Sequence, residues 1–176
     1  MRTEHEPQAD AASNRGMSGA VAVALASGAF IAPLLLSRST SPTPDHPRVF
    51  LWYRTLRQPS FKPPDAVIPL AWIAIETCLA GAAYRLLRKA PSPARNRSLA
   101  LLGGNVLAIG AWSRLFFGRR HLPASTVAAA AMVATGARYV AEARRVDAPS
   151  AAAGVPFTAW VAFATVLTGA IWRLNR

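Results

Sequence analysis

The sequence is poor in cysteine, histidine and acidic side chains, and each shortage excludes a class of site. Its 176 residues include a single cysteine, Cys78, so an intramolecular disulfide, a Cys-x-x-Cys motif and a c-type haem attachment are all excluded. The three histidines fall in the N-terminal tail and in predicted loops without ligand spacing, so we expect no metal site. The sequence also lacks a nucleotide-binding loop, a catalytic triad and a nucleophile with a base at motif spacing, and it offers no catalytic residue.

The shortage of acidic residues leaves a strongly basic chain. Eight Asp and Glu stand against 20 Lys and Arg, which gives a formal net charge of +12. Clustered basic residues are typical of nucleic-acid binding. Here almost all of them lie at the ends of apolar stretches, where Lys and Arg anchor helices in the headgroup region. We therefore expect a lipid bilayer as a partner and no nucleic acid.

Charge of either sign is absent from two long stretches, one between Arg15 and Arg38 and one from Ala148 to Trp172. As a helix the second stretch would be roughly 38 Å long, more than a bilayer core of about 30 Å. A helix in lipid satisfies its own backbone groups, so such a run needs no other explanation. The chain is predicted to be an integral, multi-pass membrane protein.

The apolar segments predict one all-α domain, a bundle of five transmembrane helices over residues 17–176, after a disordered polar tail over residues 1–16. The five helices are expected at about 17–36, 65–87, 98–117, 123–143 and 151–174. The fourth is alanine-rich and the least apolar. Gly118 is interpreted as the cap of the third helix, and Pro123 and Pro156 suit positions near helix starts.

The first apolar segment allows a second interpretation, a signal peptide. Small residues at 24–29 would suit a cleavage site, but the segment exceeds a usual h-region and Arg2 and Arg15 form a weak n-region. We favour a retained helix.

The longest predicted loop, residues 37–64, contains six prolines. Such density is expected to exclude a regular helix and to leave extended or turn geometry. The loop also carries Phe50, Leu51, Trp52, Tyr53 and Phe61. A solvated linker would not need that aromatic content, so we expect the loop to pack as a lid or to lie at the membrane interface.

Glu76 is an ionisable residue deep in a predicted membrane helix, about eleven residues from its start, and such residues are functional candidates. Trp72 lies one helical turn earlier on the same face. Two interpretations stay open. Glu76 pairs, directly or through water, with Arg114 near the end of the third helix, or it is protonated and hydrogen-bonded within the packing.

Aromatic residues recur at helical spacing on two further segments. The fifth helix repeats Trp160, Ala164, Leu167 or Thr168, and Ile171, and the third repeats Asn105, Ala108, Trp112 and Phe116. One such stripe is more typical of core packing. Three Trp-bearing stripes in one small bundle favour flat walls around a planar apolar ligand. Gly104 and Ala108, spaced by four, would permit close helix approach in a homodimer or in internal packing.

Several short motifs occur in a fixed order along the chain. They are Trp52-Tyr53-x-x-Leu56-x-x-Pro59-Ser60-Phe61-x-Pro63-Pro64, then Pro69 and Trp72, then Trp112 and Phe116-Phe117-Gly118, then Pro156, Ala159-Trp160, Phe163-Ala164-Thr165, Leu167 and Trp172-Arg173-x-Asn175. With these residues the chain resembles the TspO/MBR translocator-protein family, also called tryptophan-rich sensory proteins. The resemblance implies a five-helix bundle, often dimeric, with a cavity beneath the first loop that binds porphyrins, sterols or benzodiazepine-type ligands. It also implies that Trp72, Trp160 and Ala164 line that cavity.

The chain departs from the family pattern at several positions. Phe61 stands where Trp is usual and Glu76 where Tyr is usual, and Ser113-Arg114 replace a Pro pair. Gly169 removes the Tyr that a sterol-recognition motif on the fifth helix would need. We therefore expect the fold to hold, whereas the departures bear on the identity of the ligand, with sterol the least expected ligand.

These observations predict a bacterial cell-membrane protein that binds a porphyrin-like ligand, without a covalently bound cofactor, as a sensor, carrier or regulator. The predicted ligand-binding residues are Trp52, Tyr53, Pro63, Trp72, Glu76, Trp112, Phe116, Phe117, Trp160, Phe163 and Ala164. Two rival hypotheses stay open. One is light- or oxygen-dependent breakdown of porphyrin, with paired indoles as redox partners. The other is a structural bundle that has lost its ligand.

Overall fold

The computed structural model describes residues 16–176. The disordered tail predicted for residues 1–16 therefore lies, apart from Gly16, outside the described residues. The Met17 backbone N–H donates a hydrogen bond of 2.9 Å to the carbonyl of Leu87, and the Arg88 guanidinium donates one to the carbonyl of Met17. The chain is thus attached to the bundle from its first described residues.

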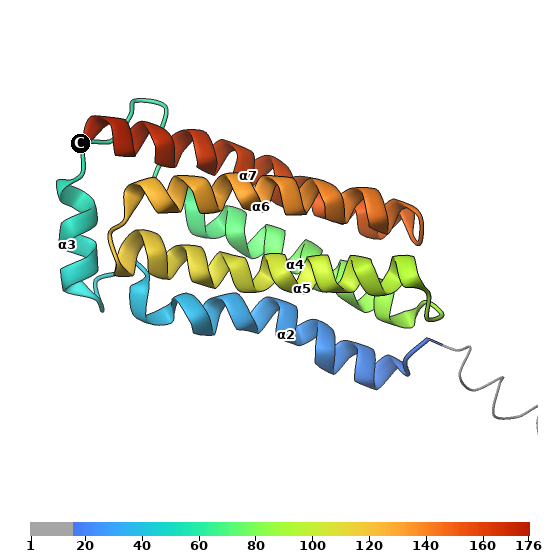
Figure 1. The fold of residues 1–176 in the computed structure, drawn as a ribbon. Coiled ribbons are helices and arrows are strands. Elements are labelled where there is room, and N and C mark those ends of the chain that lie inside the picture. The colour runs from blue at the N-terminus through green and yellow to red at the C-terminus, as the bar shows by residue number, and fades with distance from the viewer. Residues whose placement is uncertain (1–15) are drawn as a thin grey trace, which may run out of the picture.

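The described part of the chain consists of helices and their connecting loops, without strands. Its α-helices are α2 (Gly19–Ser37), α3 (Pro47–Thr55), α4 (Val67–Arg88), α5 (Pro93–Ser113), α6 (Leu122–Arg144) and α7 (Ala148–Leu174), joined by a 3-10 turn η1 (Arg38–Thr40) and a π-helical turn η2 (Arg114–Gly118). Five long helices run side by side, and the short α3 lies across one end of them (Figure 1). The predicted all-α bundle is confirmed, and α3 is an additional helix.

Four segments of the described chain are long and apolar enough to cross a membrane, namely Gly19–Thr40, Val67–Arg88, Pro93–Gly118 and Ala148–Leu174. The fifth long helix, α6, is not among them, in keeping with its alanine-rich sequence. Its 23 residues still extend over about 34 Å, and it packs along both α5 and α7. The protein is an integral membrane protein.

The long helices form a closed ring in the order α2, α4, α7, α6, α5 and back to α2, with some contact between α4 and α5 across the ring. The core is densest in the half where α4 ends and α7 begins. Leu86, Ala143 and Phe157 are fully buried there, and Tyr139 is 1% exposed. The Tyr139 ring lies against Gly154, where a Cβ atom would come within 2.4 Å of the ring carbon Cε1. Glycine therefore allows α6 and α7 to approach closely.

A buried carboxylate joins three elements at this end of the bundle. Asp147, between α6 and α7, accepts hydrogen bonds from Arg85 at 2.8 Å and from Ser150 Oγ at 2.7 Å, and its other oxygen lies 2.9 Å from the ammonium of Lys89. The Arg85 guanidinium above all, with Ser150 and Lys89, holds the pKa of Asp147 well below its usual range. Asp147 also caps α7, since the Ser150 backbone N–H donates to it.

Two helix starts differ from the prediction. α5 begins at Pro93 rather than near Ser98, because proline is tolerated in a first turn and Ser92 accepts a capping hydrogen bond from the Arg95 N–H. α7 begins at Ala148, so Pro156 lies inside the helix and not near its start. Pro91 and Pro93 mark the start of α5, and Pro149 marks the start of α7.

Two expectations for the connections were also wrong. The proline-rich segment 37–64 was expected to lack regular helix, yet α3 forms over Pro47–Thr55. Pro47 occupies its first turn and no further proline follows until Pro59. Gly118 is not a left-handed cap either. The π-helical turn passes through Gly118, and Arg120, with φ 55°, is the residue of the described chain that has a positive φ.

Candidate functional site

Five predicted site residues form one aromatic cluster at the end covered by α3. This cap cluster consists of Trp52, Tyr53, Trp112, Phe116 and Phe117. Trp112 stacks on Phe116 with ring centroids 5.0 Å apart, and Trp52 meets the same ring edge-on at 5.9 Å. Tyr53 lies edge-on to Phe117 at 5.5 Å. Of the two expectations for the first loop, a packed lid or a place at the membrane interface, these contacts of α3 support the packed lid.

The π-helical turn brings neighbouring residues of one helix into this cluster. Successive side chains of an α-helix point about 100° apart. In η2 the Arg119 N–H bonds to the carbonyl of Arg114 at 2.8 Å, which closes a wider turn. Phe116 and Phe117 both lie against Trp112, at 5.0 and 6.0 Å. The Trp112 indole N–H donates to the carbonyl of Ser125 at 3.0 Å and so links α5 to α6.

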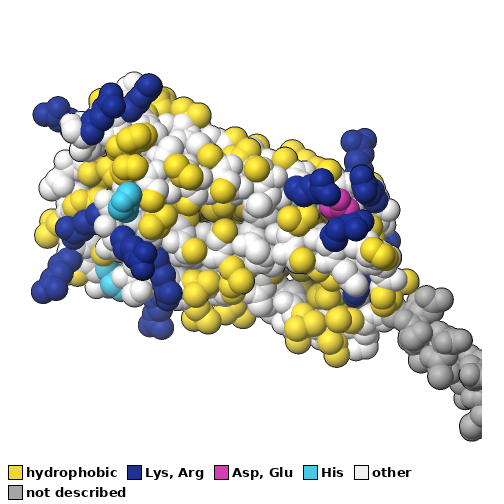
Figure 2. Space-filling view, in the orientation of Figure 1, with side chains coloured by type: hydrophobic (Ala, Val, Ile, Leu, Met, Phe, Trp, Pro, Cys, Tyr) yellow, Lys and Arg dark blue, Asp and Glu magenta, His cyan; other side chains and the backbone are white. Residues whose placement is uncertain are grey.

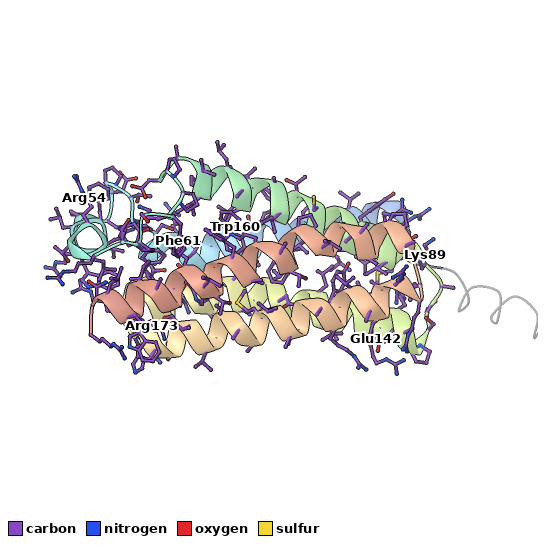
Figure 3. All side chains as sticks on the ribbon, turned by 90° about the horizontal axis from the view of Figure 1, so that it is seen from above. Arg54, Phe61, Lys89, Glu142, Trp160 and Arg173 are labelled. Atoms are coloured by element: carbon purple, nitrogen blue, oxygen red, sulfur yellow. The ribbon has the colours of Figure 1, made fainter. Side chains whose placement is uncertain are left out.

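Four further aromatic residues form an inner cluster between α4, α7 and the loop, namely Phe61, Trp72, Trp160 and Phe163. Trp72 and Trp160 face each other from α4 and α7, edge to face, at 6.4 Å. Phe163 contacts both Trp160, at 5.6 Å, and Phe61, at 6.4 Å. Phe61 was absent from the predicted site, although it belongs to the motif-bearing loop. Figure 3 shows Phe61 and Trp160 toward the end of the bundle that carries Arg54.

The inner cluster is less densely packed than the core at the Asp147 end. Trp72, Trp160, Phe163 and the neighbouring Ala164 are all half-buried, and Phe61 is 49% exposed. These flat side chains are only partly covered and lie on helices that face each other. They can therefore move apart and admit another flat group.

Cations surround the aromatic end. Lys62 lies 5.2 Å from the ring centre of Tyr53 and forms an ion pair with Asp65, and Arg120 lies 5.2 Å from the ring centre of Trp52. Burial raises the pKa of the Tyr53 phenol. Burial also works against the charge of Lys62, but the hydrogen bond that Lys62 donates to Asp65 and the contact with Tyr53 outweigh it and raise the lysine's pKa. Both the ammonium and the phenol therefore keep their protons at neutral pH.

The loop over this end is fastened to the end of α7 by one side chain. The Asn175 amide accepts a hydrogen bond from the Arg57 N–H and donates one to the Arg57 carbonyl, both at 2.9 Å. It also donates to the carbonyl of Ile171 at 2.7 Å. The sequence presented Asn175 only as part of a motif, because its partner is distant along the chain.

Glu76 lies in α4, one turn beyond Trp72, and is 6% exposed. The hypothesis of a direct ion pair with Arg114 was wrong, because Arg114 is exposed at the start of η2 and the ion pairs of the described chain do not include Glu76. A contact between the two residues through water stays a prediction. The Glu76 carboxyl also has no hydrogen bond to another described residue. No fully enclosed side-chain oxygen or nitrogen of the described residues lacks a partner. The carboxyl oxygens of Glu76 therefore border space that a water molecule can reach.

The predicted residues are thus divided between two aromatic clusters, with Glu76 and Ala164 below the inner one and Pro63 half-buried in the loop. Two hollows in the described part of the chain are lined by none of the predicted site residues. One, of about 480 Å³, lies between α2 and α4, and the other, of about 650 Å³, between α5 and α6. In residues 16–176 no three His, Cys, Asp or Glu side chains lie close enough to hold a metal ion.

Comparison with known proteins gives one consistent result. The model of the TspO/MBR family matches residues 20–173. A translocator protein from Ovis aries is 28% identical over 132 residues, covering 72% of this chain and 76% of that protein. Protein CrtK from Rhodobacter capsulatus is 28% identical over 129 residues, covering 70% and 78%. A tryptophan-rich sensory protein from Cereibacter sphaeroides is 27% identical over 124 residues, covering 70% and 77%.

Proposed function

Because the chain belongs to the TspO/MBR family of membrane proteins, we propose that it binds a planar apolar ligand of porphyrin type and acts as a sensor, carrier or regulator. Relatives bear the names translocator protein and tryptophan-rich sensory protein, which support a role in carrying or sensing a ligand. The proposed binding site is the inner cluster, together with Ala164 and Glu76.

The observation that carries this proposal is the carboxyl group of Glu76, which lies below two facing indoles and has no hydrogen-bond partner among residues 16–176. A buried carboxyl without a partner in an apolar helix bundle is unfavourable unless a proton, water or a ligand satisfies it. Trp72 lies one helical turn away on α4, and its ring meets Trp160 from α7. The flat faces of a porphyrin would stack on the indoles, and Glu76 would supply a polar contact at the edge of the ring.

Ligand entry requires the two indoles to separate. Trp72 and Trp160 meet edge to face, a contact worth about 1 kcal/mol beyond burial, so a large flat ligand that stacks on both would replace more contact than it removes. The small Ala164 leaves room for a ring on the α7 side. The loop of Phe61, fastened by Asn175, would then close over the ligand.

A purely structural bundle is a second candidate, and the cap cluster favours it. Phe116 is 2% exposed, and its ring is in contact with four neighbouring rings, those of Trp52, Tyr53, Trp112 and Phe117. A cluster so well filled leaves little space for a ligand. We therefore assign the cap cluster to holding α3 in place and restrict the proposed ligand site to the inner cluster.

Titration of the purified protein with protoporphyrin, followed by tryptophan fluorescence, tests this assignment. We expect saturable quenching that Trp72→Phe and Trp160→Phe each weaken about tenfold, the loss of roughly one well-placed aromatic contact. Trp172→Phe is the matched control, because Trp172 is 36% exposed at the C-terminal end of α7. Absence of saturable quenching would leave the structural bundle as the function.

The same samples distinguish binding from porphyrin breakdown. Under illumination, loss of porphyrin absorbance that requires Trp72 or Trp160 would indicate catalysis by the indoles. Unchanged absorbance with intact binding would indicate a sensor or carrier.

A further inference from the structure

The outer side of α5 and α6 contains a long shallow groove that the proposed ligand site does not involve. Its volume is about 650 Å³, and its walls are mostly small residues of the two helices, with Arg97 and Arg138 at one end and Ala108 and Ala128 at the other. From residue 97 to residue 108 of α5 the groove extends over about 16 Å. A Cβ atom added to Gly104, in its wall, would meet no other atom within 4 Å. The groove therefore has the length and width for a hydrocarbon chain.

A cluster of arginines stands at one end of this groove. Arg97, Arg138 and Arg145 all approach Glu142, at 3.3, 2.9 and 3.7 Å. The Glu142 side chain is 2% exposed, whereas those of the three arginines are 55–66% exposed. One carboxylate cannot neutralise three guanidinium groups, so the cluster retains two positive charges on its outer side. Figure 2 shows basic side chains around an acidic one at this end and a surface without charged side chains beside it, over the middle of the bundle.

We propose that this groove binds one anionic phospholipid, with its phosphate against Arg97 and Arg138 and one acyl chain along α5 and α6. Guanidinium groups bind phosphate through paired, charge-assisted hydrogen bonds, and each of these arginines has N–H donors left over. Basic pockets between membrane helices are a recurrent way of holding anionic headgroups. The proposal does not depend on the function proposed for the inner cluster.

The arginines decide between a lipid and a second copy of the chain as the occupant. Two copies in one membrane would have the same orientation, so a two-fold contact through this face would bring both arginine clusters to the same depth and close together. Their like charges would repel each other. A phospholipid phosphate supplies the opposite charge at that depth.

Native mass spectrometry of the full chain tests the proposal with phosphatidylglycerol and phosphatidylcholine of identical acyl chains. We expect one phosphatidylglycerol per chain, bound about tenfold more tightly than phosphatidylcholine, as one charge-assisted contact would give. Arg138→Gln should remove most of this preference. The fold should be preserved, since Arg97 and Arg145 still pair with Glu142. Gly104→Leu should fill the groove and weaken retention of both lipids.

Each variant has a matched control on the same helix. Arg144→Gln removes an exposed arginine of α6 that has no ion pair with another described residue, and Gly103→Leu enlarges a neighbouring glycine of α5 outside the groove. Both should leave lipid binding unchanged. Equal binding of the two lipids, or equal effects of Arg144→Gln and Arg138→Gln, would refute a specific phosphate contact. If Gly104→Leu dissolved a homodimer but left lipid retention intact, the groove would be a protein interface and the proposal would be wrong.

Discussion

The two ends of the helix bundle are packed with different kinds of side chain. At the end held by Asp147, small and polar residues fit closely, and Ser150 and Phe157 have no exposed surface. At the end covered by α3, large flat rings meet mostly edge to face, and Trp72 and Trp160 remain half-buried. Close packing with ion pairs fixes the positions of the helices, whereas partly covered rings leave local freedom of movement. One end can therefore serve as a rigid frame for a binding site at the other.

The largest expected effect comes from adding one methyl group at the packed end. Gly154→Ala would place its Cβ 2.4 Å from the Tyr139 ring, whose hydroxyl donates to the Ser150 carbonyl at 2.8 Å. We expect a loss of about 3 kcal/mol in unfolding free energy, measured by denaturation in detergent. Gly169→Ala toward the other end is the control, since its Cβ would meet Thr126 at an ordinary 3.5 Å. Equal losses in both variants would remove the contrast between the ends.

Asp147→Asn tests the ion-pair network of the packed end. Because Arg85 and Lys89 are nearly half-exposed, we expect a loss of about 2 kcal/mol at neutral pH, less than for a fully buried pair. The folded pKa of Asp147 lies below the unfolded value of about 3.9, so its contribution is fully present above that value and disappears as pH falls through the folded pKa. The stability difference between wild type and variant should therefore shrink in acid. A constant difference from pH 7 to pH 2 would contradict the charge contribution.

The two buried glutamates provide a direct comparison between a paired and an unpaired carboxyl. Glu142→Gln removes the partner of three exposed arginines and should cost about 1 kcal/mol, because solvent already screens those arginines. Glu76→Gln should change thermal stability by less than about 0.5 kcal/mol and instead alter protoporphyrin affinity. A large destabilisation by Glu76→Gln would show that Glu76 belongs to the frame.

The smallest expected effect concerns the attachment of the loop. Asn175→Ala removes two hydrogen bonds to the Arg57 backbone that lie near solvent, so the global loss should be about 0.5 kcal/mol. Hydrogen exchange in residues 56–62 should nevertheless become much faster, while α4–α7 at the Asp147 end stay protected. Unchanged exchange in the loop would mean that the aromatic contacts alone hold it.

The sequence predicted the long helices well because charge-free stretches in a membrane protein have few alternatives. The errors came from proline, which was treated as a break where it stands in a first turn, at Pro47 and Pro93. Ser92 before Pro93 is a cap signal that could have corrected the start of α5. The residues on both sides of a proline must therefore be considered when a helix start is predicted.

The candidate site was harder to predict because its contacts join distant segments. Helical spacing placed Trp72 and Glu76 on one face, and the spacing of Arg138, Glu142 and Arg145 was equally readable. The meeting of Trp72 with Trp160, and of Arg97 with Glu142, depends on the order of helices around the ring. The direct ion pair of Glu76 with Arg114 was predicted wrongly for the same reason, since two residues at the same depth in a membrane can point in different directions.

The widened turn at Arg114–Gly118 makes chain length matter more there than residue identity. Removing one residue from that turn would restore ordinary α-helical geometry, with a hydrogen bond that spans four residues instead of five, so Phe116 and Phe117 could not both keep their places against Trp112. The linked ring system around Phe116 would then come apart, although the composition of the segment had barely changed. Insertions and deletions at this point should therefore be tolerated far less than substitutions, and alignments with distant relatives should be anchored there.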